Sequence, residues 1–243
     1  MKIKYGVIPA AGRGARMGLL TRAVPKELLP VGGKPSIQYA VEAMVGAGIE
    51  KIFIITGWKK HAVLDFFGSG KEFGVDIAYV VQDDVCGLSK AISAVEPFIN
   101  EPFLTILGDD IFYGEGLVSG IISDHIKRNA VATIGVEQVK DVSRFGVVVS
   151  DTTGKINTVV EKPKQGIIKT NDVACGIYVF DKTLFAAVRQ TQPGVNNEYQ
   201  LADAINVLVN DELPVFSHKI RGKRITVGSI EDLRKANRFF DAV

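Results

Sequence analysis

Residues 1–110 alternate short apolar runs with segments in which apolar residues recur every three or four positions. The apolar runs predict strands at 5–9, 51–56, 76–81 and 103–107. The helical spacing predicts helices at 35–48, 59–67 and 88–98. Strands that alternate with helices across short links predict a parallel sheet covered by helices on both faces.

The second half of the chain has a different pattern. Strand-like runs occur at 131–136, 146–149, 156–160 and 173–180, and helical segments at 198–210 and 230–240. Turns such as 151–154 separate these strands, which predicts partly antiparallel pairing. Because no Pro- or Ser-rich linker divides the chain, we expect one domain over 1–243 with a Rossmann-like three-layer α/β/α fold. Its central sheet is expected to be mixed and mostly parallel.

Composition narrows the class of protein. The chain is 47% hydrophobic and 23% charged, as in soluble globular proteins, which excludes a disordered chain. Charged residues interrupt every apolar stretch well short of the ~20 residues that span a bilayer, and residues 1–12 lack the features of a signal peptide. We therefore expect no membrane partner.

Charge and cysteine usage add two further expectations. A net charge of +2 is too small for a nucleic-acid footprint, so no nucleic-acid partner is expected. The two cysteines, Cys86 and Cys175, lie far apart in the sequence. Two unpaired cysteines favour a reducing compartment, and we expect a cytoplasmic protein.

The loop after the first strand contains the first candidate chemistry. Residues 9–17 read Pro-Ala-Ala-Gly-Arg-Gly-Ala-Arg-Met, and Pro25-Lys26 follow. Glycines expose backbone N–H groups to anions, and Arg and Lys suit phosphate oxygens. A tight turn with solvated arginines is the alternative. A nicotinamide-dependent oxidoreductase is disfavoured because Met17 replaces the third glycine of the dinucleotide fingerprint.

Several short motifs, taken in order, resemble the sugar-1-phosphate nucleotidylyltransferases and most closely their uridylyltransferase branch. Each motif is weak alone, but their shared order covers most of the chain. The motifs span residues 10–17, 25–30, 34–39, 107–109, 145–146, 160–163, 176–178, 198–203 and 227–229.

The resemblance implies a reaction and a set of site residues. A sugar 1-phosphate, expected to be glucose 1-phosphate, would attack the α-phosphorus of UTP in line, giving UDP-glucose and pyrophosphate. Residues 1–110 would bind the nucleotide and 111–243 the sugar. The implied catalytic residues are Arg16, Lys26 and Asp109. The implied nucleotide-binding residues are Ala10, Ala11, Gly12, Gly14, Gln82 and Gly87, and the implied sugar-phosphate-binding residues are Gly146, Glu161, Lys162 and Gly176.

The resemblance also implies a metal, and here the chain departs from the family pattern. Asp109 would bind Mg²⁺, a hard cation that takes carboxylate and phosphate oxygens. The family typically has a second metal-binding Asp two residues before Gly228, where this chain has Thr226. Ala15 replaces a usual Thr, which is a milder change because its backbone N–H is retained.

Two alternatives to the uridylyltransferase prediction stay open at this point. A dTTP-dependent thymidylyltransferase differs in a base methyl and a ribose hydroxyl, and one methyl contact is worth only ~1–3 kcal/mol. Thr226 also motivates a non-catalytic nucleotide-sugar sensor or regulatory subunit. The sequence leaves a homo-oligomer open.

Overall fold

One mixed sheet forms the centre of the molecule. The computed structural model describes residues 2–57, 60–164 and 166–242. Among these residues nine strands form one sheet, whose main path runs β10-β9-β11-β6-β1-β4-β5. The strands of the first half pair in parallel: β1 (Tyr5–Ala10), β4 (Lys51–Thr56), β5 (Asp76–Val81) and β6 (Phe103–Ile106). Their carboxyl ends therefore meet at one edge.

Strand β11 joins the second half to this sheet. It spans Asp172–Phe180 and pairs antiparallel with β6, placing Ile177 opposite Ile106. On its other side lie β8 (Ala132–Gln138) and β9 (Gly146–Ser150), both antiparallel to it. The sheet is completed by β10 (Ile156–Glu161), antiparallel to β9, and β12 (Val215–Lys219), parallel to β8. The predicted mixed sheet is confirmed.

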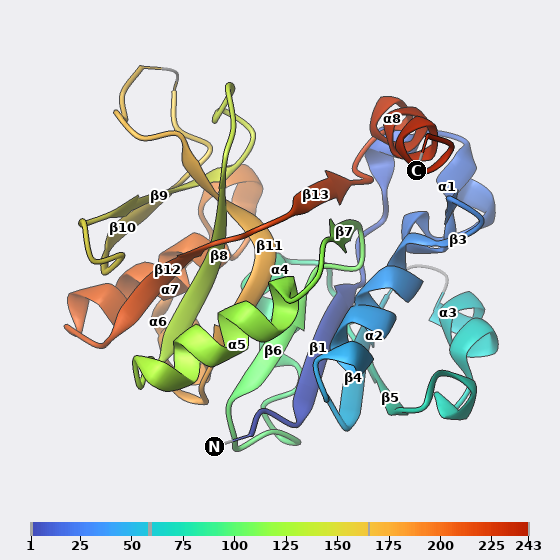
Figure 1. Cartoon of the computed structure of the whole chain (residues 1–243), viewed down its shortest axis with the longest axis horizontal. Helices are drawn as coiled ribbons and strands as arrows, with labels where there is room; N and C mark the ends of the chain where they lie inside the picture. The colour runs from blue at the N-terminus through green and yellow to red at the C-terminus, as the bar shows by residue number, and fades with distance from the viewer. Residues whose placement is uncertain (1, 58–59, 165, 243) are drawn as a thin grey trace.

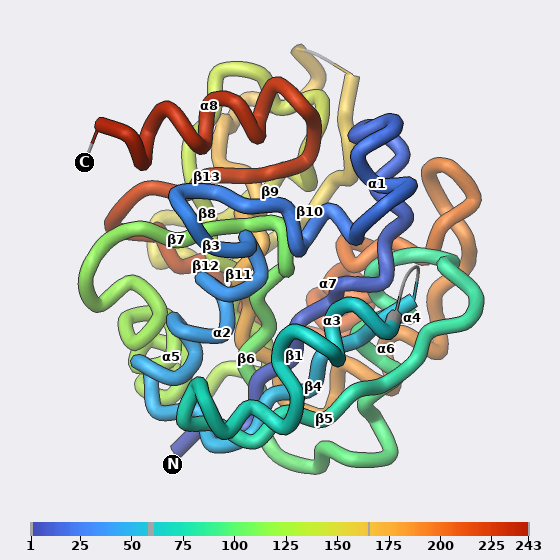
Figure 2. The backbone as a smooth tube through the Cα atoms, turned by 90° about the vertical axis from the view of Figure 1, so that its right-hand side faces the viewer, coloured from blue at the N-terminus to red at the C-terminus, as the bar shows by residue number. Residues whose placement is uncertain are grey.

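Helices cover both faces of the sheet (Figures 1 and 2). One apolar core lies between the sheet and α2 (Ser36–Gly46), α3 (Lys60–Phe67) and α5 (Leu117–Lys127). The other contains residues of α4 (Leu88–Ser93), α6 (Thr183–Gln190) and α7 (Leu201–Asn210). The expected three-layer α/β/α fold is therefore confirmed. None of the helices in the described part of the chain is long and apolar enough to cross a membrane.

A smaller unit packs beside the sheet and brings the C-terminal segment to the first half. Strands β7 (Asp110–Tyr113) and β13 (Lys223–Thr226) form an antiparallel ribbon, and β2 (Pro30–Val31) pairs with β3 (Lys34–Pro35). Figure 1 shows β13 running toward α8 (Ile230–Phe240), which lies near α1 (Leu20–Ala23). A small core joins these parts: Met17, Leu29, Val31, Ile111, Ile225, Val227 and Ala236.

Three predicted helices are longer than the observed ones. The helix predicted at 35–48 is observed at Ser36–Gly46, and the other two differences have identifiable reasons. Helix α4 ends at Ser93 rather than 98, since Pro97 disfavours helical geometry in the residue before it and has no N–H to donate. Helix α7 begins at Leu201 rather than 198, because the backbone of Tyr199 bonds the Cys86 carbonyl at 2.7 Å. The prediction for 59–67 matches α3 (Lys60–Phe67), although Lys59 lies outside the described residues.

Candidate active site

The polar loops at the carboxyl ends of the parallel strands lie together at one edge of the sheet. Ala10 ends β1 and Ala11 follows it; both are buried. The turn after β4 packs on this loop, since a Cβ on Gly57 would lie 2.9 Å from the Ala11 carbonyl oxygen. The Gly108 N–H donates to the Pro9 carbonyl at 3.3 Å, which fixes the turn that carries Asp109 beside the loop.

Lys26 and Asp109 form an ion pair at this edge. The Lys26 ammonium donates to the Asp109 carboxylate, and its Nζ lies 3.7 Å from Glu27 Oε1. The side chains of Lys26 and Asp109 are 14% and 18% exposed, so a ligand can reach them. Burial opposes both charges, yet each partner stabilises the other: the pKa of Asp109 is lowered and that of Lys26 is raised. Burial raises the pKa of Glu27 to about 7.

The glycine-rich loop places Arg16 against the C-terminal segment at Gly228. Gly14 has φ 65°, a conformation that glycine adopts without steric cost, and it precedes the short 3₁₀ helix η1 (Ala15–Met17). Met17 is fully buried and anchors this helix, whereas Arg16 is exposed. A Cβ on Gly228 would lie 3.1 Å from an Arg16 guanidinium nitrogen. The fold thus brings the first motif and the C-terminal 227–229 motif into contact.

The residues predicted to contact the base follow β5. The Gln82 N–H donates to the Thr56 carbonyl at 2.8 Å, and its side chain is 8% exposed. Its amide nitrogen has no hydrogen-bond partner within the described residues. At Gly87, φ is 126° and a Cβ would lie 2.4 Å from the Tyr199 carbonyl oxygen, so the approach of Tyr199 requires glycine here. Base binding by Gln82 and Gly87 stays a prediction.

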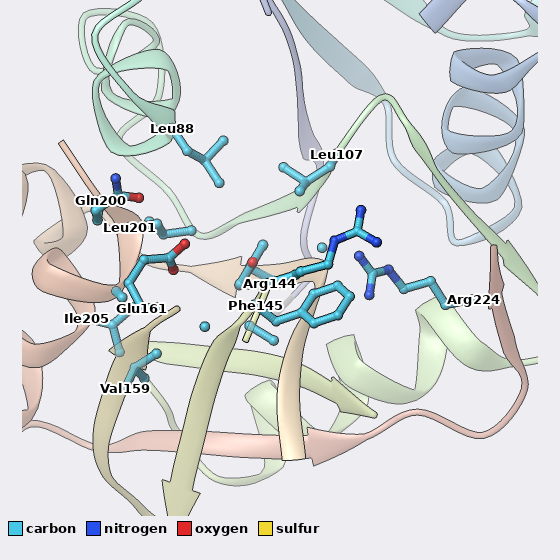
Figure 3. Close-up of a pocket in the computed structure, with 15 residues that line it drawn as sticks. Leu88, Leu107, Arg144, Phe145, Val159, Glu161, Gln200, Leu201, Ile205 and Arg224 are labelled. Carbon is cyan, nitrogen blue, oxygen red and sulfur yellow. The ribbon is translucent and has the colours of Figure 1, made fainter. Parts of the chain in front are cut away.

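A cavity of about 170 Å³ opens between β9, β10, β11 and α7. Gly146, Glu161 and Gly176, all predicted to bind the sugar phosphate, line it together with Gln200. Figure 3 shows Glu161 and Gln200 on one side and the guanidinium groups of Arg144 and Arg224 on the other. The cavity is therefore polar at both ends, with hydrogen-bonding groups at one and cations at the other.

Lys162 stands just outside this cavity in a strained backbone conformation. Its φ of 43° is uncommon for a residue with a Cβ, and its N–H donates to the Phe145 carbonyl at 3.0 Å. The Nζ atom lies 3.3 Å from Glu161 Oε1, and the side chain is 35% exposed. Strain of this kind clusters at functional sites, which agrees with the predicted role of Lys162.

A buried network of ion pairs, which the sequence did not predict, lies beside the cavity and includes Arg224, one of its lining residues. Arg224 donates to Asp110 at 2.8 Å and to Glu137 at 2.7 Å, and is 8% exposed. Burial raises the pKa of Asp110 to about 6 although Arg224 opposes this. A Cβ on Gly176 would lie 2.0 Å from Asp110 Oδ2, so glycine at 176 leaves room for this carboxyl.

The oxygen atoms of Asp109 and Thr226 are suitable ligands for a hard cation that also binds phosphate oxygens. Thr226 pairs with Asp110 across β7 and β13, and the Val227 N–H donates to the Asp109 carbonyl at 2.8 Å. Thr226 therefore lies next to Asp109, where the resemblance places the second metal-binding residue. Within the described residues no group of three or more His, Cys, Asp or Glu side chains could hold a metal ion by itself.

Comparison with known proteins identifies the family. A family model described as nucleotidyl transferase matches residues 5–242. The chain belongs to the nucleotidyl transferase family. Enzymes of this family generally use a divalent metal. A UTP–glucose-1-phosphate uridylyltransferase of Staphylococcus epidermidis is 37% identical to this nucleotidyl transferase, over 93% of the chain and 88% of the relative.

Two solved structures are similar to this nucleotidyl transferase over nearly its whole length. One is a UDP-glucose pyrophosphorylase complexed with UDP-glucose, with a TM-score of 0.90 and 32% identity, covering 99% of each chain. The other is a putative glucose-1-phosphate thymidylyltransferase from Bacillus anthracis, with a TM-score of 0.88 and 31% identity, covering 98% of this chain and 96% of that one. The predicted family and fold are therefore confirmed.

Proposed function

We propose that this nucleotidyl transferase transfers a uridylyl group from UTP to glucose 1-phosphate, giving UDP-glucose and pyrophosphate. The observation that carries the proposal is the partly buried Lys26–Asp109 pair at the carboxyl ends of the parallel strands, beside the glycine-rich loop. Ligands of open α/β sheets bind at this edge. The 37% identical uridylyltransferase supports the choice of substrates.

The nucleotide half positions the triphosphate and stabilises charge. The backbone N–H groups around Gly12 and Gly14 bind phosphate oxygens, and Lys26 neutralises the α-phosphate. Arg16 stabilises the charge that grows on the leaving pyrophosphate. The unpartnered amide nitrogen of Gln82 is available to donate to a carbonyl oxygen of the pyrimidine.

The sugar half presents the nucleophile. Glu161 accepts hydrogen bonds from sugar hydroxyls within the cavity, and Lys162 binds the phosphate on the sugar. One oxygen of that phosphate attacks the α-phosphorus of UTP, the new P–O bond forms, and the bond from the α-phosphorus to the bridging oxygen breaks. Such a transfer requires positioning and charge stabilisation rather than covalent catalysis by the protein.

Asp109 is the residue proposed to hold the metal, which we expect to be Mg²⁺. Its carboxylate already accepts a cationic partner in Lys26, so the chemistry of this position fits a cation. The ion would supply positive charge to the phosphate oxygens. Thr226 offers a neutral hydroxyl there, and Mg²⁺ readily keeps waters in place of protein ligands.

A pyrophosphate-release panel tests the proposed function. It crosses UTP, dTTP, CTP, ATP and GTP with several sugar 1-phosphates in the presence of Mg²⁺. We expect the highest kcat/KM with UTP and glucose 1-phosphate. A preference for dTTP would assign the thymidylyltransferase activity that the Bacillus anthracis structure is named for. Nucleotide binding without pyrophosphate release from any pair would favour the sensor alternative.

Replacing Lys162 by Ala is expected to raise the KM for the sugar 1-phosphate more than that for UTP. Loss of a charged hydrogen bond costs ~1.5–3 kcal/mol, which corresponds to about 10- to 100-fold. Both residues carry a Cβ, so the strain at φ 43° is retained. Steady-state kinetics with each substrate varied measure the effect, with the exposed Lys164→Ala as control. A change in the nucleotide KM alone would reverse the assignment of the two phosphate sites.

Replacing Thr226 by Asp is expected to lower the Mg²⁺ concentration for half-maximal activity by about tenfold, because a carboxylate binds the ion more strongly than a hydroxyl. Without metal the variant should melt at a lower temperature than wild type, since the new charge faces Asp110. Thr226→Asn supplies the neutral control. Loss of activity in a folded, Mg²⁺-saturated Thr226→Asp enzyme would show that this position does not face the metal.

A further inference from the structure

Glu27 is a buried carboxyl group beside the catalytic centre that the proposed reaction does not use. Its side chain is only 2% exposed, and Oε1 lies 3.7 Å from Lys26 Nζ. Its second oxygen, Oε2, is buried and has no hydrogen-bond partner among the described residues. Because an unpaired buried acceptor costs free energy, this oxygen calls for an explanation.

The position of Glu27 is fixed by the fold. It lies in the short 3₁₀ helix η2 (Lys26–Leu28), and the fully buried Ser36 hydroxyl lies 3.1 Å from both the Glu27 and the Gly108 carbonyl oxygens. A Cβ on Gly108 would lie 3.2 Å from Glu27 Cγ. The segment that carries Lys26 and the turn that carries Asp109 are therefore held together around the Glu27 side chain.

Lys26 is consequently shared between two carboxylates. Asp109 is its close partner and Glu27 its more distant one. The Lys26 ammonium now contacts the Asp109 carboxylate directly. A divalent cation bound to that carboxylate would therefore repel the ammonium. Glu27 is positioned to become the remaining partner of Lys26, because its Oε1 lies 3.7 Å from Nζ and its Oε2 has no hydrogen-bond partner among the described residues.

We propose that Glu27 is a positioning residue that retains Lys26 in the site when Asp109 is taken by the metal–nucleotide complex. The inference rests on the proposed function. In the free enzyme Lys26 bonds Asp109; with metal and nucleotide bound, its ammonium shifts toward Glu27 and donates to the α-phosphate. Glu27 contacts neither substrate in this scheme and acts only through Lys26.

The test is a Glu27→Gln variant, which keeps the shape of the side chain and removes its ionisable carboxyl group. It is compared with wild type at about pH 8, above the Glu27 pKa of about 7, where Glu27 is charged. Lys26 then has Asp109 alone as an anionic partner and competes more strongly with the metal. We expect kcat to fall about tenfold with little change in the KM for sugar 1-phosphate. Mn²⁺ binding in the presence of UTP, followed by electron paramagnetic resonance without sugar phosphate, should weaken by a similar factor. Glu50→Gln, which breaks the exposed pair with Lys2, is the matched control.

Unchanged Mn²⁺ binding and kcat in a folded Glu27→Gln enzyme would overturn the proposal. So would a variant that melts at a lower temperature but binds Mn²⁺ as wild type does, because that result marks a purely structural role. If Glu27→Gln does not fold, Glu27→Asp replaces it: a carboxylate drawn back by one methylene should weaken Mn²⁺ binding by a smaller factor, and an unchanged value would again overturn the proposal. Wild type that binds Mn²⁺ and UTP but releases no pyrophosphate would contradict the proposed function alone, since the Mn²⁺ titration still tests Glu27.

Discussion

Replacement of Asp109 by Asn is expected to reduce turnover about a thousandfold or more. The change removes the carboxylate that would hold the metal, and a bound metal contributes several kcal/mol of charge stabilisation to such transition states. With Thr226 in place of a second acidic residue, the carboxyl group that remains on the ribbon is Asp110, which is buried and bonded to Arg224. The variant retains a side chain of the same size that can still accept a hydrogen bond from Lys26.

Folding should be little affected by Asp109→Asn, because Lys26 keeps Glu27 as an ionic partner at 3.7 Å. The measurements are pyrophosphate release across a Mg²⁺ titration and the melting temperature. Asp76→Asn is the control, since Asp76 is exposed at the start of β5, at the opposite end of the strand from the site. A folded Asp109→Asn enzyme with the Mg²⁺ dependence of wild type would exclude Asp109 as the metal ligand.

The strands and the edge on which the site forms follow from local sequence. The continuous apolar run at 51–56 predicts β4 with its observed bounds, Lys51–Thr56, because a strand buried on both faces needs apolar residues at successive positions. The alternation of strands and helices predicts parallel pairing, and parallel pairing places the ends of β1, β4, β5 and β6 together. This geometry is why the glycine-rich loop and Asp109 meet, although about a hundred residues separate them.

The unpredicted parts of the site depend on long-range contacts. Arg224 joins Asp110 and Glu137, which are 114 and 87 residues away in sequence, and no local pattern indicates such a network. The local sequence likewise does not distinguish Glu27 from an ordinary surface glutamate. Only the fold shows that it is buried against Gly108. Helix α5 (Leu117–Lys127), in contrast, had a local signal: its buried residues Leu117, Ile121 and His125 recur every four positions.

Replacement of Arg16 by Ala is expected to lower kcat about 10²–10³-fold, the usual cost of losing one donor that stabilises charge in the transition state. The guanidinium is exposed and lies against Gly228, so little packing depends on it, whereas the adjacent Met17 anchors the loop in the core. The melting temperature should therefore stay near that of wild type. The exposed Arg22→Ala in α1 is the control, as it removes an arginine from the neighbouring helix. If folded Arg16→Ala enzyme releases pyrophosphate at close to the wild-type rate, the loop binds the triphosphate without help from Arg16, and charge on the leaving group must be stabilised by other groups.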